Sequence, residues 1–389
     1  MATSENTQDN LRQRLALRIR ERREQLRMTQ QQLAQAASLG AAQSVSDIER
    51  EKRDVRAYEL GPIAKALHWN LTDLFGDMEE EEEEPVVVWR SKPDDMAMAA
   101  QDEARFRQLW ENYHLAEIWA DEELAEELPE VSHRGGKFDI HWARTIAEEA
   151  RQALGLGSLP ASALLQTLEE RYGVKIFFLD GLSGSAASSR GPFGVAIALN
   201  AKERPWRRNY SLAHELFHLM TWKLLGPETS DTTGTWSTHI EKLAEAFASS
   251  LLLPEDAVRK SLDRRREEQG ISQSSLIDMA REFAVSSEAL LWRLVSLEIL
   301  KEKQVRELLA GSGFRAMDRM SFPLSAKPDL YPERFFRLLE VAYRDGEVSM
   351  GRVAEMTGYN LAETHRWLSQ LDTEEETNAR QGEQFVRLA

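Results

Sequence analysis

Apolar residues recur at intervals of three and four positions along most of this chain, a spacing that predicts a largely helical protein. In residues 1–78 the pattern predicts five short helices, of which the first spans Leu11–Arg27 and the third lies near Ala42–Arg50. Thr29 is expected to cap the second helix, because its hydroxyl can accept a hydrogen bond from an N–H of the first turn.

The next stretch differs in composition. Positions 79–84 hold six consecutive glutamates, followed by Pro85, which predicts a solvated linker because like charges repel and proline stops a helix. Val86–Glu130 is then expected to be helical and amphipathic. Within it Arg105–Trp110 is expected to form a packing or dimer helix, and the expected assembly is a homodimer.

From Ile140 the periodicity predicts both helices and strands. Helices are expected over 143–154 and 161–172, and Gly173 is a typical residue for ending a helix. Val174–Leu179 and Phe193–Asn200 are predicted strands, joined as a hairpin-like pair by the Gly- and Ser-rich residues 181–191.

Helical periodicity returns after this pair. A helix, a short turn and a second helix are expected over 276–297, and three short helices over 331–371. The predicted fold class is therefore a multidomain, mostly α protein with one small sheet in a central α+β domain and a small C-terminal helical unit. The expected boundaries are 1–78, 79–139, 140–310, 311–371 and a polar tail at 372–389.

Composition narrows the possible functions. The 389 residues contain no cysteine, which excludes a disulfide scaffold, thiol catalysis and thiolate zinc ligands. No run of 18 apolar residues and no signal peptide are evident, so we expect a cytoplasmic protein without a membrane partner. The net charge of −16 would disfavour nucleic acid, but Leu11–Arg27 alone holds seven arginines against two glutamates.

The strongest chemical signal is the segment Tyr210–Trp222. It contains His214, Glu215 and His218 in the order His-Glu-x-x-His, on a helix that is apolar almost all round and therefore buried. Residues i and i+4 share one helix face, so the two imidazoles can bind one Zn²⁺ per chain while Glu215 serves as general base. The alternative is a surface helix that happens to carry two histidines, but buried polar side chains need partners and a metal supplies them.

A catalytic zinc site needs a third protein ligand. The second apolar helix, expected over 238–256 and broken by Pro254, offers Glu241 and Glu245 on the border of its apolar stripe. Either carboxylate could face the first helix, and the residues alone do not choose between them.

From Arg208 to Pro254 the chain resembles the ImmA/IrrE metallopeptidases, zinc enzymes that cleave repressors. The shared pattern is His-Glu-x-x-His followed by ExxAxxFAxxLLxP, which begins at Glu241. The resemblance implies Glu241 as the third ligand. The order of helices, a small sheet and then His-Glu-x-x-His fits a zincin-type α+β fold. His239, two residues before Glu241, could stabilise an oxyanion, and the alternative is a structural or solvated histidine. Two positions depart from the pattern: Phe217 stands where the family commonly has Gly, and Glu245 where it has Asn.

The N-terminal segment Arg18–Arg53 resembles the Cro/C1-type (XRE) helix-turn-helix domains. That resemblance implies binding to double-stranded DNA, with the second helix of the pair in the major groove. The residues then expected at base edges are Gln43, Ser44 and Asp47, and those expected at phosphates are Gln30 and Arg53. The alternative is a small helical bundle that makes only protein contacts.

Two function classes follow. One is a DNA-binding regulator with zinc endopeptidase activity that cuts a repressor-like protein and so switches transcription. The other is a transcription factor whose peptidase-like domain is a metal-stabilised sensor that no longer cuts. Retention of Glu215 favours the first, because a sensor has no chemical need for a general base.

Overall fold

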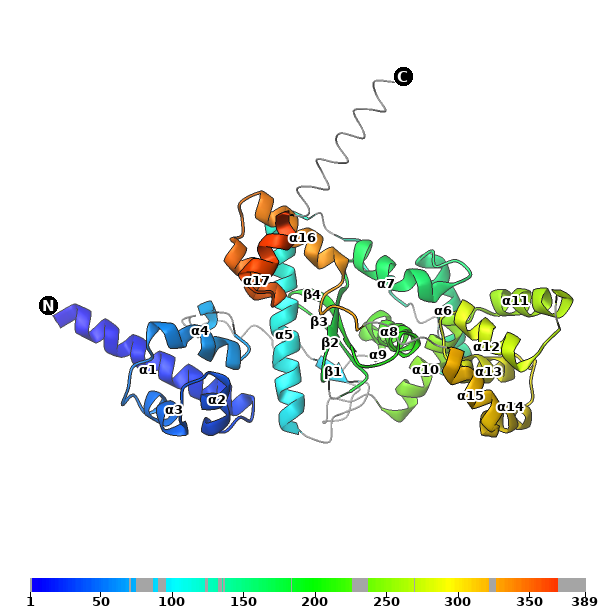
Figure 1. The fold of residues 1–389 in the computed structure, drawn as a ribbon, viewed down its shortest axis with the longest axis horizontal. Helices are drawn as coiled ribbons and strands as arrows, with labels where there is room; N and C mark the ends of the chain where they lie inside the picture. The colour runs from blue at the N-terminus through cyan, green and yellow to red at the C-terminus, as the bar shows by residue number, and fades with distance from the viewer. Residues whose placement is uncertain are drawn as a thin grey trace, which may run out of the picture.

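A computed structural model describes residues 2–69, 71–74, 87–89, 96–122, 125–131, 135, 137–182, 184–225, 237–268, 270–321 and 327–369. The predicted class is confirmed: the protein is mostly helical, with one small mixed sheet (Figure 1). The glutamate run at 79–84 and the tail from residue 372 lie outside the described residues. Among the described helices, none is both long and apolar enough to cross a membrane.

Four α-helices and a 3₁₀ helix account for the five helices predicted at the N-terminus. They are α1 (Ala2–Gln25), α2 (Gln30–Ala36), α3 (Ala42–Glu49), α4 (Ala57–Ala66) and η1 (Leu71–Leu74). Thr29 caps α2 as predicted, since its hydroxyl accepts from the Gln32 N–H at 3.2 Å while the Gln32 side chain accepts from the Thr29 N–H at 2.7 Å. A core that includes Leu33, Val45 and Ile63 holds these helices together.

The sheet has four strands in the order β1-β3-β4-β2: β1 (Val87–Trp89), β2 (Lys175–Leu179), β3 (Ala186–Gly191) and β4 (Gly194–Asn200). The predicted strands at 174–179 and 193–200 are confirmed within one residue, but their pairing as a hairpin was wrong. They run parallel, and the hairpin is formed by β3 and β4. β3 was expected to be a loop because Ala, Ser and Gly give no strand signal. It pairs with β4 on one side and β1 on the other, and its first four residues are buried.

A second prediction, that the chain is helical at β1, was also wrong. Val87–Trp89 was expected to be part of a helix, but three residues of a valine-rich run pair with β3, as β-branched side chains favour. The helix α5 begins only at Met96 and ends at Trp119. The segment 125–131 is not helical either.

Alternate residues of the strands face two separate cores, so helices cover both faces of the sheet. Ile176, Ile197 and Leu199 belong to the core that contains α8 (Pro205–Met220). The same core includes residues of α6 (Ile140–Ala153), α7 (Pro160–Glu170), α10 (Thr238–Leu252), α12 (Gln273–Glu282) and α13 (Ser287–Ser296). The remaining helices of this half of the chain are α9 (Trp222–Leu225), α11 (Glu255–Glu268), α14 (Glu302–Ala310) and α15 (Ser312–Ser321).

The opposite face of the sheet is covered by α5 and by helices from the C-terminal part of the chain. Phe177, Ala196 and Ala198 share the second core with residues of α5, of α16 (Glu333–Arg344) and of α17 (Met350–Thr357). Figure 1 shows α5 and α8 on opposite sides of the sheet. The predicted connector and C-terminal unit therefore pack directly on the strands of the α+β region.

Buried ion pairs fasten this second layer. Glu117 of α5 contacts Lys175 Nζ at 2.7 Å and Arg334 Nη1 at 2.8 Å, and both basic side chains are almost fully buried. The side chains that were candidates for a dimer helix, Phe106 and Trp110, are also buried inside the chain.

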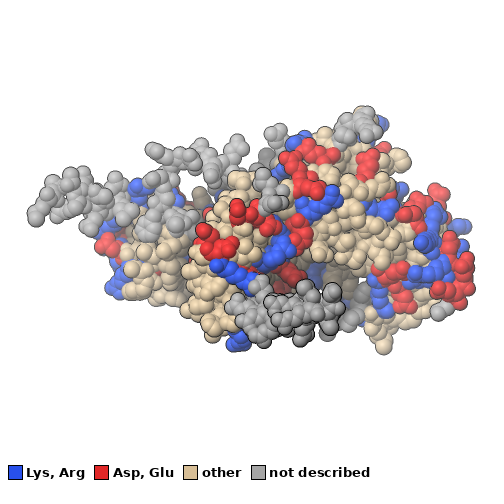
Figure 2. Space-filling model, turned by 90° about the horizontal axis from the view of Figure 1, so that it is seen from above, with Lys and Arg blue, Asp and Glu red and all other residues tan. Residues whose placement is uncertain are grey.

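Far from this layer, Figure 2 shows positive and negative side chains interleaved at the end of the molecule that carries α11, where Arg264 and Arg265 both pair with Glu282.

Candidate metal centre

The helix α8 presents His214 and His218 on one face. Pro205 occupies its first turn, where a missing N–H costs nothing, and every residue from Ser211 to Met220 is buried. Both imidazoles have no exposed surface. Their Nε2 atoms lie 3.2 Å apart, as the i,i+4 spacing requires of two side chains that converge on one point.

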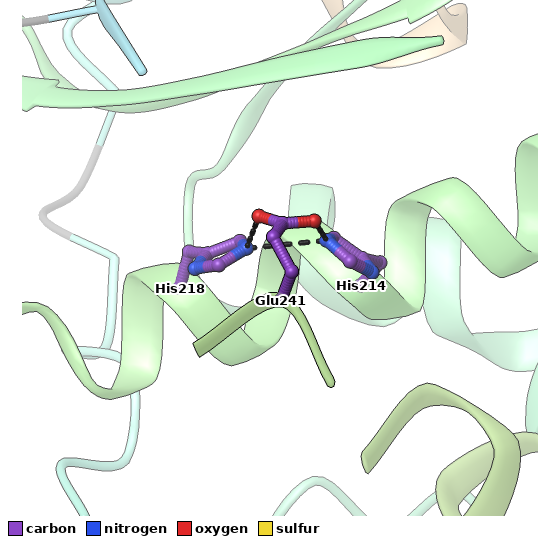
Figure 3. A group of neighbouring side chains, drawn as sticks. All are labelled: His214, His218 and Glu241. Carbon is purple, nitrogen blue, oxygen red and sulfur yellow. Dashed lines mark hydrogen bonds and ion pairs between the residues drawn. The ribbon is translucent and has the colours of Figure 1, made fainter. Parts of the chain in front are cut away.

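Glu241 reaches these histidines from the first turn of α10. Ser237 caps that helix through the Ile240 N–H, which fixes the turn on which Glu241 lies. One carboxylate oxygen is 3.2 Å from His214 Nε2 and the other is 3.4 Å from His218 Nε2 (Figure 3). The three residues form a group whose ligand atoms all lie within 4.8 Å of one another.

This donor set fits a tetrahedral metal ion. Two ligand atoms bound to Zn²⁺ at tetrahedral angles with bonds of ~2.0 Å lie about 3.3 Å apart. The two Nε2 atoms are 3.2 Å apart, close to this value, and each imidazole has a different oxygen of Glu241 beside it, at 3.2 Å for His214 and 3.4 Å for His218. Burial by itself raises the pKa of Glu241, but the contacts with His214 and His218 outweigh it and lower the pKa to about 2.

Glu215 lies beside this group and is fully buried. Its Oε2 accepts a hydrogen bond of 2.7 Å from the hydroxyl of Ser188, which is itself fully buried on β3. The sheet therefore fixes the orientation of the carboxylate that the sequence identified as a general base. Ser188 is the residue that sequence reasoning missed, because it falls in the segment interpreted as a Gly- and Ser-rich loop.

The two glutamates left open by the sequence differ in position. Glu245 is exposed, and the metal-binding group among the described residues contains Glu241 alone of the two. The Glu245 backbone carbonyl accepts a hydrogen bond from Tyr210.

Phe217 stands where the resembling family commonly has Gly. It packs against Trp142, Phe247 and His218, with ring centroids 5.5 to 6.1 Å apart. It thus fills the space behind the two histidines.

His239 does not join this group. It is exposed, and its Nε2 lies 2.7 Å from the backbone carbonyl of Phe138. In this arrangement Nε2 is a donor to the main chain, so only a rotated ring could present it to a reacting group. The oxyanion role of His239 stays a prediction.

The residues predicted to contact DNA lie on α2, α3 and the segment after α3, and four of the five form hydrogen bonds within the protein. Gln43 Nε2 is 2.7 Å from Asp47 Oδ1, and Gln30 Nε2 is 2.8 Å from Glu49. Arg53 forms a two-pronged pair with Glu59 at 2.9 to 3.1 Å. Gln43 is exposed, while Ser44 and Asp47 are half-buried.

Comparison with known proteins assigns part of the chain. Residues 169–295 match the Peptidase M78 family model, described as an IrrE N-terminal-like domain. The matched segment contains β2, β3, β4, α8 and α10, and with them the group of His214, His218 and Glu241.

A solved structure of a Mycobacterium tuberculosis transcriptional regulator is similar to part of the chain, with 19% identity and a TM-score of 0.29. The similarity covers 47% of this chain and 51% of that one, so this chain spans about half the length of the protein it matches. No curated protein matches the sequence.

Proposed function

We propose that this protein is a DNA-binding transcriptional regulator with zinc-dependent endopeptidase activity, which cuts a repressor-like protein to switch gene expression. The observation that carries the proposal is the placement of a buried Glu215 next to a group of three candidate metal ligands, whose ligand atoms lie within 4.8 Å of one another. A metal-stabilised sensor would need the ligands but not a buried carboxylate held by its own hydrogen bond from the sheet.

The residues divide the work of peptide hydrolysis. His214, His218 and Glu241 would hold Zn²⁺, which polarises a scissile carbonyl and makes water acidic at neutral pH. Glu215 accepts the proton of the attacking water and delivers it to the leaving amine. Ser188 restricts rotation of the Glu215 carboxylate by donating a hydrogen bond to one of its oxygens, which leaves the other oxygen to act as the base.

The N-terminal helices supply the DNA-binding half of the proposal. The arginine-rich α1 provides charge for phosphates, and α3 presents Gln43 at its exposed face. Contact with bases would require Gln43 to exchange its hydrogen bond to Asp47 for one to a base edge, and contact with a phosphate would open the pair of Arg53 with Glu59. Duplex binding is therefore expected to reorganise this surface locally.

The substitution Glu215→Gln separates the two function classes. The amide is nearly the same size but cannot accept the proton, so the variant should retain about one zinc per chain and lose proteolysis. It should also trap the substrate, which can be identified by pull-down and mass spectrometry. A zinc-loaded Glu215→Gln protein that still gives a normal promoter response in cells would overturn the peptidase proposal in favour of the sensor.

A further inference from the structure

The strand next to the candidate active site comes from a distant part of the chain. β1 runs antiparallel to β3, with Val87 opposite Ser189, Val88 opposite Ser188 and Trp89 opposite Ala187. In sequence, β1 lies about a hundred residues before β3. Its contribution is main-chain pairing along the outer edge of β3.

That edge is adjacent to the catalytic carboxylate. The residue opposite Val88 is Ser188, whose hydroxyl binds Glu215 at 2.7 Å. Neighbouring strands lie about 4.8 Å apart. The backbone of β1 therefore passes within one strand spacing of the residue that orients Glu215.

An extended peptide can bind a protein by adding a strand to a sheet, since main-chain hydrogen bonds give affinity without demanding a particular sequence. The edge of β3 next to Glu215 is suited to hold a peptide in this way, but only if its N–H and C=O groups are available. In the present structure β1 uses them.

We propose that the outer edge of β3 is the docking site for an extended segment of the protein substrate, and that residues 87–89 occupy it as an internal competitor. This inference rests on the proposed peptidase function. β1 must leave β3 before a substrate strand can pair there, so the enzyme is inactive until the strand is displaced.

The way β1 is held favours such a switch. The ladder is only three residues long, so its intrinsic stability is small, but its covalent attachment raises its effective concentration beside β3. Val87 is buried in the same core as Phe106 of α5 and Phe335 of α16. A change in the packing of either helix on the sheet would therefore loosen β1.

The first test measures docking without proteolysis. The full chain carrying Glu215→Gln is titrated with a fluorescent synthetic peptide that copies residues 86–92, and Val87→Pro and Val88→Pro are introduced separately. The N–H groups of successive strand residues point in opposite directions, so one of the two prolines removes a ladder hydrogen bond and the other removes an N–H that faces away. At least one variant should bind the peptide tenfold or more tightly than its parent, with faster hydrogen exchange at the amides of 187–189. Unchanged affinity in both variants overturns the proposal.

The second test locks β1 onto β3 instead of loosening it. Because the chain has no other cysteine, Val87→Cys combined with Ser189→Cys can form only one disulfide within a chain, across the facing pair. The oxidised protein should fail to bind the peptide, and reduction should restore binding. Equal binding in both redox states refutes the competition. Failure of the disulfide to form refutes the pairing.

These measurements keep the two proposals apart. If the proline variants gain peptide binding but, with Glu215 retained, still cut no trapped partner, the docking site stands and the peptidase function fails. If cleavage is observed but neither proline nor disulfide alters peptide binding, the peptidase stands and β1 is only a structural strand.

Discussion

Replacing Ser188 with alanine tests whether the sheet orients Glu215, the proposed general base. The change deletes the hydroxyl that donates a 2.7 Å hydrogen bond to Glu215 Oε2, and both side chains are fully buried. A hydrogen bond to a charged group contributes about 1.5–3 kcal/mol. Since about 1.4 kcal/mol is a factor of ten in rate, kcat should fall by at most roughly 150-fold, the value reached if the whole contribution acts in the transition state.

The expected signature is a fall in kcat with KM and zinc content unchanged, because Ser188 belongs to the sheet and not to the metal-binding group. Zinc is measured by mass spectrometry, and cleavage is followed on the protein trapped by the Glu215→Gln variant. The matched control is Ser189→Ala, an equally buried serine that points to the other face of β3 and should keep near wild-type kcat. Equal kcat in Ser188→Ala and wild type would refute the role assigned to this hydrogen bond.

Three further predictions concern the ligand, the DNA and the buried core. Glu241→Gln should abolish stoichiometric zinc binding whereas Glu245→Gln keeps it, and equal zinc content in the two variants would contradict the ligand assignment. In the isolated 1–78 fragment or the full-length protein, Arg53→Ala should weaken binding to all duplexes and reduce the slope of log K against log salt by about one. Gln43→Ala should mainly relax the sequence preference. If the wild-type protein binds no duplex at low salt, the DNA-binding proposal is wrong. Burial raises the pKa of Glu169 to about 8, so its protonated form stabilises the fold below the unfolded pKa near 4.5 and this contribution is lost as pH rises to 8. As the pH rises from 4.5 to 8, the free energy of unfolding of Glu169→Gln should therefore increase relative to wild type, by up to about 1.4 kcal/mol per pH unit. Urea unfolding at several pH values measures this difference. A difference that does not change with pH would contradict the raised pKa.

The sequence located the elements that depend on local signals. The cap at Thr29, the two-histidine helix and the strands near 175–179 and 194–200 are where the pattern placed them, because capping groups and periodic apolar residues act over a few positions. Gly173 also takes the left-handed conformation expected of a helix end, with φ of 60°, and a β-carbon there would meet Ala125 at 2.8 Å.

The features it missed depend on long-range contacts. β3 consists of small residues without strand propensity, and its place in the sheet is set by the helix packed on it and by pairing with β4. β1 was assigned to a helix because its short valine run gives no indication of a partner a hundred residues away. Ser188 could not be selected while its strand was unknown, since only the register brings its hydroxyl to Glu215.

The two-sided sheet has a practical consequence for dissecting this protein. A fragment that starts near residue 140 and stops near 310 would keep all three candidate metal ligands. It would lose α5 and α16, however, and leave Phe177, Ala196 and Ala198 facing water. Bare strand faces of this kind promote aggregation. If such a fragment is inactive or insoluble, the cause is therefore the loss of the helices that cover the sheet, and not the absence of catalytic residues. Activity assays are best designed around the chain from α5 to α17.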